Sequence, residues 1–152
     1  RQQFEMKSFH FHAPSEHVIE GKRYPMEMHI VHQNPENGQL AVIGIMVEAE
    51  DDRGLCSVPF TEFLHNVKDA VPTSGTVDFD PSILLPKTPQ KYYRYEGSLT
   101  TPDFAENVSW SVLKEPLKVS REELTELHEI FEKDARETQP LHRRFVLKTF
   151  QD

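Results

Sequence analysis

The chain has 152 residues, 37 % of them hydrophobic and 28 % charged, a composition typical of one soluble globular domain covering residues 1–152. Seventeen basic and twenty-five acidic residues give a net charge of −8, which argues against general nucleic-acid binding. The longest apolar run, residues 40–47, is far shorter than the about 20 residues that span a bilayer. A single cysteine excludes an internal disulfide.

The first third of the chain predicts three antiparallel strands. Residues 9–13 alternate aromatic and polar side chains, and residues 26–32 place apolar side chains on one parity, as half-buried strands do. Residues 40–48 are almost wholly apolar, which indicates a strand buried on both faces. Turn candidates at residues 20–22 and 34–38 separate the three strands, so we expect a meander.

Two amphipathic helices are predicted later in the chain. The first covers residues 59–69 and begins at Pro59, and its apolar residues recur at helical spacing: Phe60, Phe63, Leu64 and Val67. The second covers residues 121–133. Ser120 and Glu123 have the spacing of a capping box at its start.

The remaining segments predict loops and two further strands. Residues 73–89 are loop-rich, residues 109–113 resemble a strand, and residues 145–150 alternate as a closing strand would. The fold class expected from these elements is mostly β, with peripheral helices.

Three histidines are candidates for a metal site. His10 and His12 are two residues apart on a predicted strand, so their side chains point to the same face. An antiparallel partner strand can bring His29 to them, and three imidazoles with an open fourth position are typical of catalytic zinc. Glu27 shares a face with His29 and can support it from outside the ligand set.

Chance also produces such patterns, because a His-x-His pair in a strand is common. The remaining five histidines are interpreted as structural or surface residues: His17, His32, His65, His128 and His142. A cupin is one alternative, in which Glu16, four residues after His12, would bind the metal in place of His29. Phe4 and Gly21 do not match the glycines that flank the cupin motif, and the second cupin motif is absent.

Three ordered blocks resemble the α-class carbonic anhydrases, most closely the bacterial-type members. They are FHFHAPSEH at residues 9–17, EMHIVH at 27–32, and GSLTTP at 97–102 followed by VSWSVLKEP at 108–116. Residues 139–144 also resemble a C-terminal signature of that family. The resemblance extends from about Phe9 to the C-terminus.

The resemblance implies a twisted, largely antiparallel central sheet and a zinc ion bound by His10, His12 and His29. Zinc lowers the pKa of its bound water to about 7, an effect for which carbonic anhydrases are themselves the reference case. The zinc-bound hydroxide would reversibly hydrate carbon dioxide to bicarbonate and a proton. Thr100 would accept a hydrogen bond from that hydroxide and donate its own proton to Glu16.

Further residues receive roles from the same resemblance. Glu27 and Ser8 would support the ligands, with Ser8 in the place of a usual glutamine. The expected carbon dioxide pocket consists of Val31, Val42, Leu99, Thr101, Val108 and Trp110. Sulfonamides and anions are the expected inhibitors, and the family suggests a periplasmic or secreted location.

The resemblance also predicts that an N-terminal part of the family domain, which includes the usual proton-shuttle histidine, is absent here. Proton transfer would then depend on buffer, so a catalytically weak or silent, carbonic-anhydrase-like binding or structural domain is a second hypothesis. Missing strands would expose a sheet edge, which makes a homodimer a candidate assembly.

Overall fold

The computed structural model describes residues 2–50, 58–70, 79–131 and 135–151. Its elements in chain order are β1 (Glu5–His12), β2 (Val18–Ile19), β3 (Lys22–Arg23), β4 (Met26–Gln33), β5 (Leu40–Ala49), α1 (Val58–Ala70), the 3-10 helix η1 (Pro81–Leu84), β6 (Tyr92–Gly97), β7 (Val108–Leu113), β8 (Leu117–Val119), α2 (Arg121–Ile130) and β9 (Leu147–Lys148).

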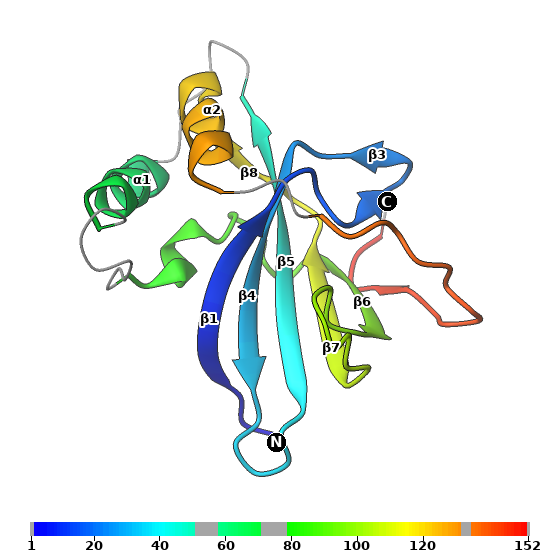
Figure 1. Ribbon diagram of the computed structural model, residues 1–152. Helices are drawn as coiled ribbons and strands as arrows, with labels where there is room; N and C mark the ends of the chain where they lie inside the picture. Colours follow the sequence, from blue (N-terminus) through cyan, green and yellow to red (C-terminus); the bar gives the residue numbers. More distant parts are fainter. Residues whose placement is uncertain (1, 51–57, 71–78, 132–134, 152) are drawn as a thin grey trace.

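One mixed, twisted sheet forms the body of the molecule (Figure 1). Its strands follow the order β1-β4-β5-β7-β6-β9, and β8 also pairs with β5. Most neighbours are antiparallel, as predicted, but β5 pairs in parallel with both β7 and β8. The expected class, mostly β with peripheral helices, is confirmed.

The three predicted N-terminal strands form the meander β1-β4-β5. Its register places His10 directly opposite His29 and His29 directly opposite Gly44. The expected turn at residues 20–22 connects β2 and β3, with Glu20 and Gly21 at φ of 50° and 81°. A two-residue hairpin loop of type I′ requires positive φ at both positions, which glycine adopts readily.

Strand β5 contributes to the core on both of its faces. Ile45 and Val47 belong to a large cluster that also contains side chains of α1 and α2, such as Phe63 and Leu127. The second cluster consists of Val42, Met46, Val108, Trp110 and Val112. The expectation that this strand is buried on both faces is therefore confirmed, and the second cluster lies beside the histidines.

The capping box predicted for the second helix is present. Ser120 Oγ accepts from the Glu123 N–H at 3.1 Å, and the Glu123 carboxylate accepts from the Ser120 N–H at 2.8 Å. Helix α2 ends at Ile130, and Phe131 is its C-cap. Residues 132 and 133 of the predicted helix lie outside the described residues.

Several segments differ from the expectations. Strands β2, β3, β6 and β8 were not predicted, although the tyrosines of β6 favour a strand. The closing strand is only two residues long, because only Leu147 and Lys148 pair with β6. The loop-rich segment contains η1, and its residues 73–78 lie outside the described part. Among the described helices, none is long and apolar enough to cross a membrane.

Candidate metal centre

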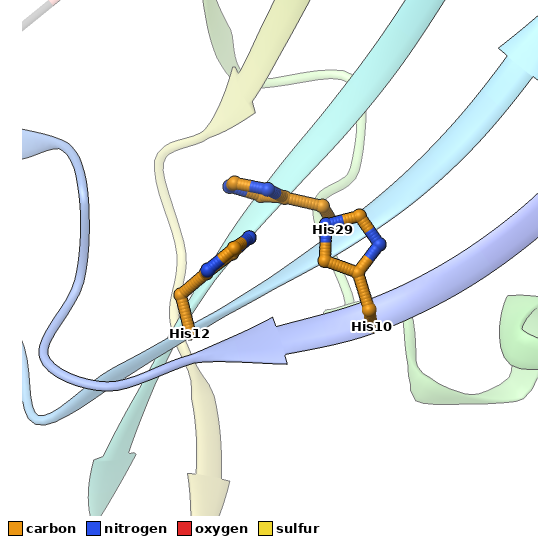
Figure 2. A group of neighbouring side chains, drawn as sticks. All are labelled: His10, His12 and His29. Atoms are coloured by element: carbon orange, nitrogen blue, oxygen red, sulfur yellow. The ribbon is translucent and has the colours of Figure 1, made fainter. Parts of the chain in front are cut away.

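Two neighbouring strands bring three imidazole rings together. His10 and His12 project from β1, and His29 projects from β4 directly opposite His10. One ring nitrogen from each histidine lies within 4.8 Å of the other two. The ring centroids are 4.8 to 5.3 Å apart, and Figure 2 shows the three rings gathered around a common space.

The donor set fits a zinc ion. Zinc in catalytic sites prefers three protein ligands, often imidazoles, and keeps a fourth position for water. His12 and His29 are each only 1 % exposed, and His10 is half-buried, so the rings have few alternative conformations. Three neutral rings can present their lone pairs to one cation without bringing net charge into the buried region.

Glu27 is the nearest support of this ligand set. The side chain is fully buried, and its Oε1 accepts from His29 Nε2 at 2.9 Å and from His17 Nδ1 at 2.5 Å. Its Oε2 accepts from the backbone N–H groups of Glu16 and His17, both at 2.9 Å. Burial alone would raise the pKa of Glu27, but the His17 and His29 rings hold that pKa well below its usual value. The bond to Nε2 leaves Nδ1 of His29 available for a metal.

Gly44 provides the space for this carboxylate. It pairs with His29 across β4 and β5, and a Cβ at this position would lie 2.9 Å from Glu27 Oε1. The sequence analysis did not select Gly44. The available signal was that Gly44 is an isolated glycine inside an apolar strand, because such a glycine often marks a place where another group approaches the backbone closely.

The two predicted catalytic residues line the same cavity, whose volume is about 1000 Å³. Glu16 is buried, and its Oε1 accepts from the Arg136 N–H at 2.8 Å and lies 3.6 Å from His12 Nδ1. Its Oε2 has no hydrogen-bond partner among the described residues. Thr100 follows β6, and the described contacts include no hydrogen bond between Thr100 and Glu16.

Five of the six expected pocket residues are buried or half-buried beside the histidines, and the sixth, Thr101, is exposed. Val42, Val108 and Trp110 are buried in the second cluster, with Val31 and Leu99 packed against it. The Trp110 ring lies 4.8 Å from the His29 ring, edge to face. This apolar surface is therefore adjacent to the histidines.

Two further predicted site residues are exposed. Thr101 lies on the surface, and so does Ser8, which precedes His10 by two residues on the same face of β1.

His17 is part of this site, although the sequence analysis interpreted it as structural or surface. Its side chain is 17 % exposed, its Nδ1 contacts Glu27, and its Nε2 lies 2.6 Å from the Tyr95 hydroxyl. Strand periodicity could not place it, because it lies in an irregular segment after β1.

Comparison with known proteins identifies the family. The model of the eukaryotic-type carbonic anhydrase family matches residues 1–150. A carbonic anhydrase of Nostoc sp. is 38 % identical, with the match covering 97 % of this chain and 54 % of that protein. One of Neisseria gonorrhoeae is also 38 % identical, over 95 % of this chain and 56 % of that protein. The chain thus spans about half the length of the curated relatives it matches.

Solved structures give the same result. The α-carbonic anhydrase of Thermovibrio ammonificans, in complex with sulfanilamide, is 40 % identical with a TM-score of 0.79, and the match covers 95 % of this chain and 63 % of that one. A carbonic anhydrase of Chlamydomonas reinhardtii, in complex with acetazolamide, is 34 % identical with a TM-score of 0.80, over 97 % and 66 % of the two chains. The cupin alternative is therefore wrong, and the chain belongs to the α-class carbonic anhydrase family.

Proposed function

We propose that this protein catalyses the zinc-dependent, reversible hydration of carbon dioxide to bicarbonate and a proton. The observation that carries the proposal is the trio His10, His12 and His29, whose ring nitrogens lie within 4.8 Å of one another. The trio lies beside an apolar surface in a chain of the carbonic anhydrase family.

His10, His12 and His29 would hold the zinc ion. Bound zinc lowers the pKa of water to about 7, which makes a strong nucleophile available at neutral pH. Glu27 orients His29 from its far side, so that the lone pair of Nδ1 points away from the carboxylate.

Glu16 and Thr100 would orient the reacting water. A threonine hydroxyl has a single proton, and a buried carboxylate is the stronger acceptor for it. We assign Glu16 Oε2, which has no hydrogen-bond partner among the described residues, as the acceptor of that proton. The Thr100 oxygen is then restricted to accepting from the reacting water, which directs the water's lone pair at the substrate.

The apolar residues beside His29 suit the substrate. Carbon dioxide is small and has no net dipole, so it gains little from polar groups. Val42, Val108 and Trp110 are each no more than 2 % exposed, and the Trp110 ring contacts His29. We assign this surface to carbon dioxide, since an apolar wall excludes competing water.

A silent, carbonic-anhydrase-like binding domain is the second candidate. The observation that favours it is that the described contacts include no hydrogen bond between Thr100 and Glu16. Against it, all three histidines are present and their ring nitrogens converge.

Stopped-flow hydration of carbon dioxide by the zinc-loaded chain distinguishes the two candidates. We expect hydration that an aromatic sulfonamide inhibits, because two solved relatives are complexes with sulfanilamide and acetazolamide. His29→Ala is the matched control, and it should show no inhibitable rate. An absence of hydration in chain that contains stoichiometric zinc would support the silent domain.

A further inference from the structure

The Thr100 loop, residues 98–107, connects β6 to β7 and carries one of the two residues proposed to orient the reacting water. The Leu99 N–H donates to the Ala105 carbonyl oxygen at 2.9 Å, a bond that closes the loop on itself around Thr100. Thr100 is half-buried and lines the large cavity together with Glu16. The position of Thr100 relative to Glu16 therefore depends on what holds the loop as a whole.

Arg136 contacts both Glu16 and the Thr100 loop. Its backbone N–H donates to Glu16 Oε1 at 2.8 Å. Its guanidinium lies against the start of the loop, where Nη1 is 3.3 Å from Ser98 Oγ and 3.5 Å from the Leu99 carbonyl oxygen. One residue thus joins Glu16 to the loop, although Arg136 and Ser98 are 38 positions apart in the chain.

The Phe104 ring holds the same guanidinium from the second half of the loop. Arg136 Cζ lies 4.2 Å from the centroid of this ring, within the range of a cation–π contact. Phe104 has a φ of 58°, a left-handed conformation that a bulky residue keeps only where surrounding contacts hold it. Its N–H donates to the Thr101 carbonyl oxygen at 2.8 Å. The guanidinium therefore bridges the two halves of the loop, with Thr100 between them.

Trp110 on β7 reports on the position of this loop. Its indole Nε1 donates to the Ser98 carbonyl oxygen at 3.0 Å, and the side chain is only 2 % exposed. Trp110 is the single tryptophan of the chain, so its indole N–H gives one unambiguous signal. The start of the loop can therefore be observed without metal or substrate.

We propose that Arg136, stacked on Phe104, is a positioning residue for the Thr100 loop and holds Thr100 at a fixed place relative to Glu16. The inference deepens the proposed function and rests on it in one respect, since Thr100 and Glu16 are taken to orient the reacting water. Arg136 touches neither substrate nor metal in this role. Its contact with Glu16 uses the backbone, so a change of its side chain removes only the contacts with the loop.

Hydrogen exchange of the Trp110 indole N–H in the metal-free chain tests the proposal, together with kcat/KM for carbon dioxide in the zinc-loaded chain. Phe104→Leu keeps an apolar side chain but removes the π face. We expect its indole N–H to exchange about 2- to 5-fold faster, as the loss of one partly exposed cation–π contact implies. Its kcat/KM should fall about 10-fold, because Thr100 is then less precisely placed. Phe104→Tyr keeps the ring and should restore both values.

A double-mutant comparison identifies Arg136 as the partner of the ring. In an Arg136→Ala background, Phe104→Leu should have no further effect on indole exchange or kcat/KM, because the contact is already absent. If Arg136→Ala does not fold, Arg136→Gln replaces it, since the amide keeps hydrogen-bond donors but has no charge. Additive effects of the two substitutions would contradict the proposal.

The matched control is Phe145→Leu, the same substitution at a ring that is 83 % exposed, and it should change neither value. Zinc affinity, from competition with a chelator, and the melting temperature should stay at the parent's values in Phe104→Leu. This result would separate a positioning role from a general loss of structure. Parental indole exchange and kcat/KM in Phe104→Leu would overturn the proposal.

The exchange measurement separates this proposal from the proposed function, because it needs neither metal nor substrate. A parent chain and variants that show the expected exchange rates but do not hydrate carbon dioxide would contradict only the proposed function. A parent chain that hydrates carbon dioxide, with indole exchange that Phe104→Leu leaves unchanged, would contradict only the positioning role of Arg136.

Discussion

His29 belongs to the candidate metal ligands and is also hydrogen-bonded to Glu27, which supports it from outside the ligand set. One ring nitrogen bonds to a fully buried carboxylate, and the ring packs against Trp110. A metal-ligating histidine gains both a defined tautomer and greater basicity from such a carboxylate partner. The role of the residue therefore depends on Glu27 as much as on its neighbours His10 and His12.

Removal of His29 should abolish zinc binding. His29→Ala deletes one of three imidazole ligands and leaves the Glu27 carboxylate with only one of its two ring partners, so we expect less than stoichiometric zinc after dialysis and no hydration. Metal analysis of the purified variant measures this outcome. Full zinc occupancy in that variant would disprove the assignment of the ligands.

Glu16→Gln should separate metal binding from catalysis. In the proposed arrangement Thr100 donates to the Glu16 carboxylate, whereas an amide oxygen is a weaker acceptor and the amide N–H can donate to Thr100 instead. We therefore expect stoichiometric zinc and a rate of hydration lowered about 10- to 100-fold. Metal analysis and stopped-flow kinetics on the same sample check both parts. A Glu16→Gln chain that loses its zinc would instead show that Glu16 is a metal ligand.

At the scale of elements, strand β5 leaves the space in which the Glu27 side chain of β4 reaches His29. Its Gly44 lies opposite His29, and the missing side chain leaves room for Glu27. Glu27 cannot move away freely, because four donors hold its two oxygens. A single methyl group at position 44 should therefore displace the Glu27 carboxylate and, through it, the His29 ring.

Gly44→Ala should reduce both stability and zinc affinity. Overpacking of this kind costs about 1–3 kcal/mol of unfolding free energy, and displacement of the carboxylate should weaken zinc binding about 10-fold or more. Urea denaturation and chelator competition measure the two effects. The matched control is Ile43→Val, because Ile43 is the neighbour of Gly44 on β5 but packs against the large cluster that contains Phe63 and Leu127. This variant should lower stability by about 1 kcal/mol and leave zinc affinity unchanged.

Glu48 links three strands at the far end of β5. Its carboxylate bonds to Lys118 on β8 and to Lys22 on β3. Partial burial would raise the pKa of Glu48, but its hydrogen bonds to the two lysines hold that pKa below its ordinary value. Because the folded pKa is the lower one, the stabilisation is present above the unfolded pKa and is lost as the pH falls through the folded value.

Glu48→Gln should therefore destabilise the chain at neutral pH and have progressively less effect in acid. Both lysine side chains are 43 % to 54 % exposed, so solvent screening limits the loss to below about 1 kcal/mol. Urea denaturation of parent and variant across the acid range measures the difference. A difference that stays constant below pH 4.5 would contradict this electrostatic origin.

For the whole molecule, metal binding and folding should be coupled. The three histidines converge only when β1 and β4 are paired in register, so zinc binds the folded chain better than the unfolded one. Zinc at 100 times its dissociation constant should add about 2.7 kcal/mol of stability. Thermal melts with and without a chelator test this, and His29→Ala should melt at the same temperature in both conditions.

The local parts of the fold were predictable because they depend on short-range physics. Alternation placed His10 and His12 on one face, and the spacing of Ser120 and Glu123 indicated the capping box that the structure contains. The family blocks added the expected positions of Glu16 and Thr100. These two line one cavity, and their catalytic roles remain predictions.

The amino-acid sequence by itself determined the three strands of the N-terminal meander, the helix starts, the family and three histidines as metal candidates, because periodicity, caps and motifs are local. Only the tertiary structure decided the parallel pairing of β5 and the support of His29 by distant residues. His17 and Tyr95 are 78 positions apart in the chain, and Gly44 meets Glu27 only across a sheet register. A periodic pattern states which face a side chain occupies, but the chain's long-range pairing decides what that side chain meets there.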